Sequence, residues 1–318
     1  MNRRILITGA NGQVGTKLYA ELAKKINCQI ITSDITENKF SFPNYEKLDV
    51  TVFEQLIAIA KKYEINEIYH MAAILSSNGE KNPNLAWDVN MNGFLNVLNL
   101  AKTLKIKKLF YPSSIAVFSS PYNKGVAFQN TRSIPKTMYG INKLTGENLC
   151  KYYHLKYGLD IRSIRYPGII GPENCAGGGT TDYAVEIFHD AIEKNFYNCF
   201  LSAPTTLPMI YIDDAIRATL EIMEVKSERI KIRTSYNLAG ISFNPFELSQ
   251  EIKKHIPDFR ITYFKDHRQI IADSWPNFIN DLEARNHWGW NPKFKLSHMV
   301  AFIIDLIKSQ NSPTSQSA

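Results

Sequence analysis

The chain has 318 residues and a formal net charge of +7, with 44% hydrophobic and 21% charged residues, an ordinary balance for a globular protein. No apolar run is long enough to span a bilayer, which argues against a membrane protein. The lysines and arginines form no basic stripe and no nucleic-acid motif, so we attribute the charge to a solvated surface and to attraction for an anionic cofactor, and expect no nucleic-acid partner. The first strand-like segment starts at Arg3, which leaves no room for a signal peptide, so we expect a cytoplasmic protein.

The cysteines point to a reduced protein without a metal site. No two of them form a C-x-x-C pair or lie near a cluster of histidines. We therefore expect free thiols, as is usual in the cytoplasm, and buried positions for the first two. The four cysteines are Cys28, Cys150, Cys175 and Cys199.

Short apolar runs alternate with longer helical patterns through the first half of the chain. This alternation predicts an α/β fold with a doubly wound parallel sheet of the Rossmann type, covered by helices on both faces. The expected strands are 5–8, 29–33, 67–71, 108–112 and 161–166. The expected helices are 14–25, 52–63, 85–104 and 137–157.

After residue 168 the alternation loosens, which predicts a smaller lobe. We expect a dinucleotide-binding domain over residues 1–168, with some later segments returning to it, a substrate lobe made mainly of residues 169–308, and a frayed tail at 309–318. The expected elements are strands 210–212 and 236–238 and helices 181–194, 213–224, 245–255 and 296–308.

A glycine-rich turn follows the first strand and opens the first helix. Gly9 permits a tight turn, Gly12 allows the backbone to approach a pyrophosphate, and Gly15 allows the helix to pack on the strand. The helix start at Gln13 and Val14 then offers free N–H groups to phosphate oxygens. These residues predict a dinucleotide site, because the glycines occur between a strand and a helix.

Asp34 ends the second expected strand, about twenty residues beyond the last of these glycines, where an acidic side chain holds the adenosine ribose hydroxyls. A carboxylate at this position repels a 2′-phosphate, and no arginine follows closely. We therefore expect NAD rather than NADP as the cofactor.

Two further stretches fit the same cleft. Asp49 and Val50 follow the next loop and could hold the adenine, although Asp49 could instead be an acid at a helix N-terminus. The third strand ends in Met71, Ala72 and Ala73, and small residues at this position would let the dinucleotide pass.

Tyr139 and Lys143 lie four residues apart on an expected helix, which puts both side chains on one face. A lysine ammonium near a phenol favours the phenolate and lowers the tyrosine pKa. Such a tyrosine can take the proton of a substrate hydroxyl while hydride leaves the same carbon. Lys143 could also hold the nicotinamide ribose.

The fourth strand ends in two serines, where hydroxyl groups face the crevice of a doubly wound sheet. Ser114 could orient the reacting oxygen toward Tyr139, whereas Ser113 could equally be a serine of the turn.

Together, T-G-x-x-G-x-x-G, the strand-end serine pair and Y-G-x-x-K resemble the extended short-chain dehydrogenase/reductase superfamily, which includes sugar-nucleotide epimerases and dehydratases. Val89-Asn90-Met91-Asn92-Gly93 resembles an element of that superfamily, which implies that Asn90 helps to shape the cofactor site. Tyr166-Pro167-Gly168-Ile169 resembles its loop beside the nicotinamide, which implies cofactor contacts for Tyr166, Gly168 and Ile169.

Three more segments, at residues 73–80, 177–184 and 272–276, resemble the short-chain type of L-threonine 3-dehydrogenase. The resemblance implies an amino-acid pocket formed by Ser76 or Ser77, Thr180, Asp182 and Trp275, together with Ser114 and Tyr139. Thr180 or Thr181 could instead cap the helix, with Asp182 in its first turn, and Trp275 could be a packing residue.

Three functions remain open at this point. The first is NAD-dependent oxidation of L-threonine to 2-amino-3-oxobutanoate without a metal. The second is a sugar-nucleotide epimerase or dehydratase, for which Arg217, Arg229 and Arg233 are available but unmarked as phosphate ligands. The third is a non-catalytic NAD-binding regulator, against which the complete set of Ser114, Tyr139 and Lys143 argues. Apolar residues around helix 85–104, with Leu149, Tyr152 and Tyr153 on the next helix, predict a homodimer.

Overall fold

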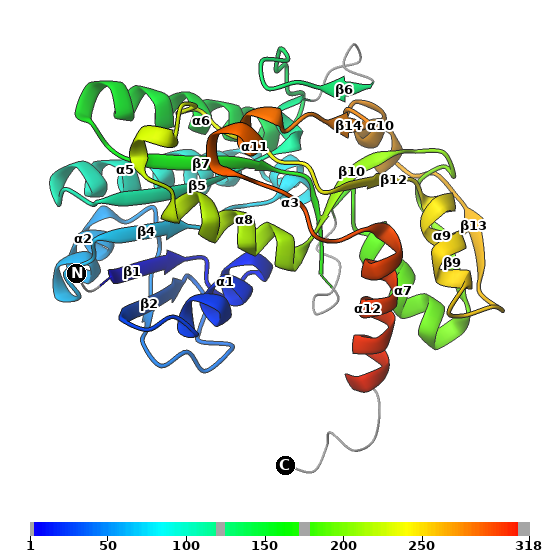
Figure 1. Cartoon of the computed structure of the whole chain (residues 1–318). Coiled ribbons are helices and arrows are strands. Elements are labelled where there is room, and N and C mark those ends of the chain that lie inside the picture. Colours follow the sequence, from blue (N-terminus) through cyan, green and yellow to red (C-terminus); the bar gives the residue numbers. More distant parts are fainter. Residues whose placement is uncertain (1–2, 119–124, 172–178, 311–318) are drawn as a thin grey trace.

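The computed structural model describes residues 3–118, 125–171 and 179–310. A seven-stranded parallel sheet forms the larger part, as the sequence predicts, in the order β11-β7-β5-β4-β1-β2-β3 (Figure 1). Its strands are β1 (Arg3–Thr8), β2 (Cys28–Asp34), β3 (Tyr45–Lys47), β4 (Glu67–His70), β5 (Lys108–Ser114), β7 (Ile161–Tyr166) and β11 (Tyr236–Asn237). The centre of β1 is buried on both faces, which explains its unbroken apolar run.

Helices cover both faces of this sheet (Figure 1). α1 (Gln13–Ala23) and α8 (Ile212–Glu224) pack on one face, where Leu18 and Ile216 join a core cluster with Ile5 and Ile7. α2 (Phe53–Lys62), α5 (Gly93–Thr103) and α6 (Met138–Tyr157) cover the other face, and their apolar side chains form a second cluster around Leu6.

A smaller lobe lies beyond the carboxyl ends of the strands. It contains α7 (Tyr183–Lys194), α9 (Pro245–Lys253) and α12 (Leu296–Gln310), and the paired strands β9 (Phe196–Cys199) and β13 (Arg260–Tyr263). A three-stranded sheet of β8 (Gly168–Ile170), β10 (Leu207–Tyr211) and β12 (Ile241–Phe243) leads into it. The remaining α-helices and strands are α3 (Ser76–Lys81), α4 (Pro83–Trp87), β6 (Val126–Ala127), α10 (Arg268–Asp273), β14 (Phe278–Ile279) and α11 (Leu282–Trp288).

Several expectations from the sequence need correction. The helix expected over 85–104 is interrupted by a π-helical turn at Asp88–Asn92 between α4 and α5. The helix expected from residue 181 begins at Tyr183, and α12 runs two residues into the expected frayed tail, whose remainder lies outside the described residues. Cys150 and Cys199 are buried and free, whereas Cys28 is only half-buried, and Cys175 lies outside the described ranges.

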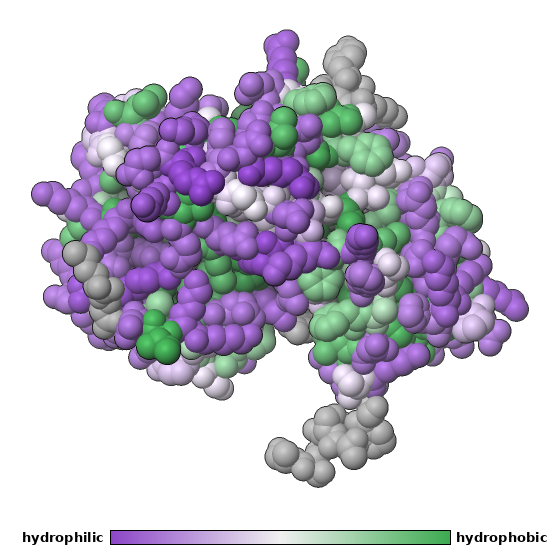
Figure 2. All heavy atoms as spheres, in the orientation of Figure 1, coloured by the Kyte–Doolittle hydropathy of each residue, from purple (hydrophilic) through white to green (hydrophobic). Residues whose placement is uncertain are grey.

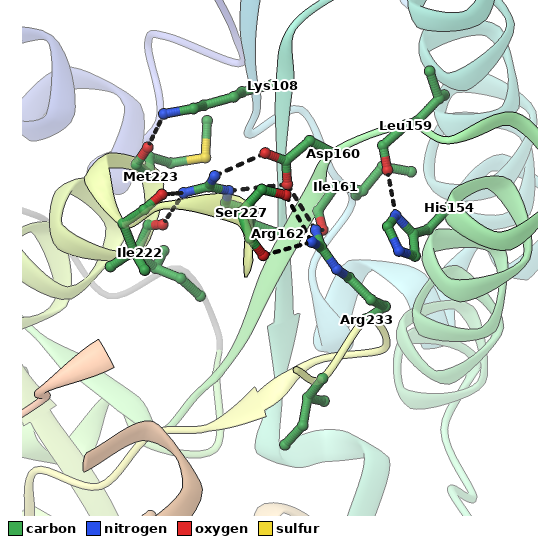
Figure 3. Close-up of polar contacts among 12 residues, drawn as sticks. Lys108, His154, Leu159, Asp160, Ile161, Arg162, Ile222, Met223, Ser227 and Arg233 are labelled. Atoms are coloured by element: carbon green, nitrogen blue, oxygen red, sulfur yellow. Dashed lines mark hydrogen bonds and ion pairs between the residues drawn. The ribbon is translucent and has the colours of Figure 1, made fainter. Parts of the chain in front are cut away.

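Two cations, buried Arg162 and half-buried Lys108, hold α8 against the sheet at the end remote from the strand tips (Figure 3). Arg162 donates hydrogen bonds to the carbonyl oxygens of Ile222 and Val225 at the C-terminus of α8, at 2.5 and 2.6 Å. Lys108 donates to the neighbouring carbonyl of Met223 at 2.6 Å. Cations satisfy the last carbonyl groups of a helix and interact well with its dipole, so these charges have a structural role.

The face seen in Figure 1 is mostly hydrophilic, with apolar side chains gathered around α7 and α12 (Figure 2). Within the described ranges, no helix combines the length and apolarity needed to cross a membrane.

Candidate active site

A cavity of about 440 Å³ opens where the carboxyl ends of β1, β4, β5 and β7 meet the smaller lobe. It brings together most of the residues that the sequence singles out. These are Gly9, Gly12, Gln13, Val14, Gly15, Met71, Ala73, Ser76, Ser114, Tyr139, Lys143, Tyr166, Gly168, Ile169, Thr180, Asp182 and Trp275. A larger hollow of about 620 Å³ lies between α1 and α8, but its charged residues are largely ion-paired with one another, as Lys25 is with Glu224, and it contains no catalytic constellation.

The glycine turn is shaped for close backbone approach. Gly9 has a φ of +68°, and a Cβ on it would lie 2.6 Å from the amide nitrogen of Ala72. A Cβ on Gly15 would lie 2.4 Å from the carbonyl oxygen of Gly9. Gly12 is the N-cap of α1, and no side chain caps this helix end, so its first N–H groups are available to an anion.

Asp34 ends β2 beside this turn and lies outside the residues that line the cavity. Its Oδ2 accepts a hydrogen bond from the backbone N–H of Asn11 at 3.1 Å, and its Oδ1 accepts from Thr36. The carboxylate is therefore tied to the glycine turn, at the rim where an adenosine ribose would lie.

Four other predicted cofactor residues also lie outside the cavity lining. The Oδ1 of Asp49 accepts hydrogen bonds from the backbone and hydroxyl of Thr51, and Val50 is buried against Gly93. Ala72 lies behind Gly9. Asn90 is buried on the π-helical turn, where its amide bonds to both backbone groups of Ile74 and to Asn142. Asn90 thus holds the segment after β4 rather than lining the cavity.

Tyr139, Ser114 and Lys143 meet at the centre of the cavity wall. Thr137 caps α6 by accepting a hydrogen bond from the N–H of Gly140 at 3.1 Å, which fixes the helix start beside the end of β5. The Tyr139 hydroxyl interacts with the side chain of Ser114. The Nζ of Lys143 lies 5.4 Å from the centre of the Tyr139 ring and donates to the carbonyl of Pro112 at 2.7 Å.

The expected lowering of the Tyr139 pKa is not found in this structure. Burial raises the pKa of Tyr139 to about 12, and the interaction with Ser114 only partly opposes that shift. Burial also lowers the pKa of Lys143 to about 8. The physical reason is the burial of the phenol, while the Nζ of Lys143 donates to the carbonyl of Pro112.

The structure separates several alternatives on the substrate side. Ser76 lines the cavity and Ser77 does not. The N-cap of α7 is Asp182, and no side chain makes a capping hydrogen bond there, so capping by Thr180 or Thr181 is not observed. The Oδ2 of Asp182 instead accepts from the N–H of Gly179 at 2.7 Å, while Gly177 and Gly178 lie outside the described residues. Trp275 is both buried and part of the wall.

Sequence reasoning missed several wall residues. Leu75, Thr181 and Val185 line the substrate side. Thr181 and Val185 are four residues apart across the start of α7, a spacing that could have indicated a shared face, whereas nothing in the sequence marks Leu75. The described part of the chain contains no group of three or more His, Cys, Asp or Glu side chains that could hold a metal ion.

Glycine turn, strand-end serine and Tyr/Lys pair at the tips of one parallel sheet define a dinucleotide-dependent enzyme of the dehydrogenase or epimerase class. Residues 5–239 match the model of the NAD dependent epimerase/dehydratase family, and the chain belongs to that family. NAD is accordingly the cofactor.

The chain is similar over nearly its whole length to known proteins. An uncharacterised epimerase/dehydratase of Staphylococcus haemolyticus is 44% identical, over 97% of this chain and 99% of that protein. A GalE-like L-threonine dehydrogenase from Cupriavidus necator in its holo form is 43% identical with a TM-score of 0.93, covering 96% of this chain and 99% of the other. A monomeric L-threonine 3-dehydrogenase from a metagenome is 47% identical, also with a TM-score of 0.93, covering 97% and 100%.

Proposed function

We propose that this enzyme oxidises L-threonine at its hydroxyl-bearing carbon, giving 2-amino-3-oxobutanoate and NADH without a metal ion. The observation that carries the proposal is the likeness to L-threonine dehydrogenases, which extends through the smaller lobe as well as the sheet. A likeness confined to the sheet would support only the shared family.

The residues around the cavity suit this chemistry. NAD, held by the glycine turn and Asp34, supplies the hydride acceptor and, when oxidised, a positive charge that favours a nearby phenolate. Tyr139 takes the proton of the threonine hydroxyl, and Ser114, which lines the same cavity, orients that hydroxyl. Lys143 contributes its charge and a hydrogen-bond donor for the nicotinamide ribose.

A zwitterionic substrate fits the donors and acceptors of the opposite wall. We propose that the threonine carboxylate meets hydroxyl and N–H donors near Ser76 and Thr180. The ammonium gains from the negative charge of Asp182, directly or through water. Leu75 and Val185 supply apolar surface for the methyl group.

The charges near the cavity favour threonine over a sugar nucleotide. Among the lining residues that the structure describes, Lys143 is the sole lysine or arginine, whereas a diphosphate calls for basic partners. Two of the arginines that could have served are ion-paired elsewhere, Arg217 with Asp214 and Glu221, and Arg233 with Asp160.

We also propose a homodimer, although α5 offers a partner less apolar surface than the sequence predicts. Most of its apolar residues, namely Phe94, Val97, Leu98, Leu100 and Ala101, are buried within the chain. The remaining support is exposed apolar surface on α4 and α6, where Trp87, Tyr152 and Leu155 are 41%, 48% and 72% exposed. One of the similar structures is described as monomeric, so the mass in solution must decide between one chain and two.

The test is formation of NADH with L-threonine, compared with UDP-glucose and UDP-galactose as substrates. We expect NADH with threonine, no conversion of either nucleotide sugar, and unchanged turnover after treatment with a chelator. Conversion of a nucleotide sugar without oxidation of threonine would overturn the proposal in favour of an epimerase. Binding of NAD without any turnover would favour a regulator.

A further inference from the structure

A buried ion pair lies directly behind the catalytic serine and lysine. Glu147 is on α6, one helical turn beyond Lys143, and is 1% exposed. Arg165 is on β7 and grips both carboxylate oxygens of Glu147, through Nε at 2.8 Å and Nη2 at 2.7 Å. Such a pair is favourable in the interior only when its geometry is good and its remaining donors are satisfied.

The remaining donors are satisfied by a polar network that continues into the chain. The Nη1 of Arg165 donates to the backbone oxygen of Gln129 at 3.1 Å and to Oδ1 of Asn237 at 3.0 Å. Gln129 and Asn237 are themselves joined, because the N–H of Asn237 donates to Oε1 of Gln129 at 2.8 Å. Arg165 is therefore fixed from three sides and has little freedom to leave Glu147.

Glu147 also holds the strand that carries the reacting serine. The hydroxyl of Ser113 donates to Oε1 of Glu147 at 2.5 Å, and Ser114 is the next residue of β5. Since successive side chains of a strand point to opposite faces, fixing Ser113 fixes the direction in which Ser114 faces the cavity. The same carboxylate thus contacts the strand of Ser114 and belongs to the helix of Tyr139 and Lys143.

We propose that Glu147, clamped by Arg165 and Ser113, is a positioning residue that sets the Ser114–Tyr139 geometry and provides the buried counter-charge for the Lys143 ammonium. Neither residue of the pair lines the cavity, so the pair acts through Ser113 and Lys143 rather than on the substrate. The inference rests on the proposed dehydrogenase chemistry.

The charges around Lys143 support this role. On its own helix Lys143 faces Tyr139, Glu147 and Cys150, while β5 presents the ring of Tyr111 at 5.0 Å and β4 presents His70. Arg165 on β7 contacts Glu147, which lies one helical turn from Lys143. Burial lowers the pKa of Lys143, and Cys150 and Glu147 oppose that shift. Of these groups Glu147 is the carboxylate, so removal of its charge should lower the pKa of Lys143 further.

The experiment compares the pH dependence of the wild type with that of Glu147→Gln, which keeps the shape of the side chain and removes the charge. We expect the alkaline limb of the kcat profile to move down by about one pH unit, as for the loss of a nearby opposite charge. We also expect kcat to fall about 10- to 100-fold with little change in KM for NAD, since small misplacements of reacting groups have effects of that size.

Asp160→Asn is the matched control, because it breaks the pair of half-buried Asp160 with buried Arg162, at 2.7 Å, beside the opposite end of β7. It should lower the melting temperature without moving the alkaline limb. If Glu147→Gln lowers the melting temperature like Asp160→Asn but leaves both the limb and kcat unchanged, the pair is merely structural and the proposal is overturned.

Two further measurements keep the proposal testable. If Glu147→Gln does not fold, the double variant Glu147→Gln/Arg165→Gln replaces the pair by neutral amides, and a downward shift is again expected, smaller because the loss of the Arg165 cation opposes it. If the wild type does not oxidise threonine, the proposed function fails, and the pH dependence of the NADH dissociation constant becomes the readout for Lys143. An alkaline limb of binding that is identical in wild type and variant would then overturn the role of Glu147 by itself.

Discussion

Gly140 lies against the carbonyl oxygen of Ala116, so closely that a Cβ on Gly140 would sit 2.5 Å from that oxygen. This contact brings the first turn of α6 onto the 3-10 turn Ile115–Phe118 that follows β5. The contact fixes the positions of two residues of the candidate site. Tyr139 directly precedes Gly140, and Ser114 directly precedes the 3-10 turn.

Replacing Tyr139 by Phe keeps the ring in this position and removes the group that accepts the proton. We expect kcat to fall by roughly 10²–10⁴-fold, the usual contribution of a general acid–base group, while the NADH dissociation constant stays nearly unchanged. Tyr152→Phe, on the exposed part of the same helix, is the control and should behave as wild type. Turnover of Tyr139→Phe close to that of the control would exclude Tyr139 as the base.

Asp34→Asn tests the choice of cofactor. The amide can still accept a hydrogen bond from the N–H of Asn11, but it no longer repels a 2′-phosphate. We expect the ratio of kcat/KM for NAD over NADP to narrow by about tenfold or more, as the removal of a close like charge implies. Glu37→Gln, at a neighbouring exposed acid, should leave the ratio unchanged. An unchanged ratio in Asp34→Asn would show that this side chain does not meet the ribose.

Thr180→Ala and Asp182→Asn test the amino-acid pocket. Both residues line the cavity, so we expect KM for threonine to rise while the NAD dissociation constant stays nearly constant. Loss of a structural contact alone would lower stability by about 0.5–2 kcal/mol, as for a lost helix cap, and leave the threonine kinetics intact. Melting temperature and kinetic constants are measured on the same preparations, and a change in the melting temperature alone would remove these residues from the pocket.

The burial of His70 leads us to expect that the free energy of unfolding falls in acid. It is buried at the end of β4, its Nδ1 is 2.9 Å from the hydroxyl of Thr8, and burial lowers its pKa to about 3, with the charge of Lys143 adding to the shift. An unfolded histidine has a pKa near 6.5, so between pH 6.5 and 3 the unfolded chain binds the additional proton. The free energy of unfolding must therefore fall as the pH drops through that window, by up to about 1.4 kcal/mol per pH unit for this group.

Urea unfolding at a series of pH values measures that slope. His70→Gln should reduce it, because glutamine does not titrate, whereas His267→Gln at an exposed position should not. Equal slopes in wild type and His70→Gln would mean that His70 is not held neutral in the folded protein.

The oligomeric state tests the exposed surface of α6. We expect a light-scattering mass of two chains for the wild type and of one 36.3 kDa chain for Leu155→Glu. Phe264→Glu, at an equally exposed residue of the smaller lobe, should keep the wild-type mass. A wild-type protein with the mass of one chain at micromolar concentration would refute the dimer.

The sequence predicts the sheet and its dinucleotide turn well because both depend on local patterns. Gly9, Gly12 and Gly15 are spaced for a strand, a turn and a helix, and the apolar runs of β1, β2 and β4 are buried. The π-helical turn was not predictable, since one extra residue per turn hardly alters the apolar period. Its cause is distant, because the turn presents Asn90 to Ile74 and Asn142.

The site itself is only partly readable from the sequence. The spacing of Tyr139 and Lys143 predicts their common helix face, but not that Lys143 turns toward Pro112 and that burial dominates both pKa values. Leu75 and Val185 line the cavity because of how the smaller lobe packs on the sheet, and no local sequence pattern predicts that packing. The partnership of Glu147 with Arg165 spans two elements and likewise depends on the assembled sheet.

The most direct test of hydride transfer from threonine uses L-threonine carrying deuterium on the hydroxyl-bearing carbon. After incubation with the enzyme and NAD, the mass of the reduced cofactor shows where the hydrogen went. We expect one deuterium in each NADH formed and a slower hydride-transfer step than with unlabelled threonine. Unlabelled NADH, or no NADH at all while the protein still binds the cofactor, would contradict the assignment of threonine as the hydride donor.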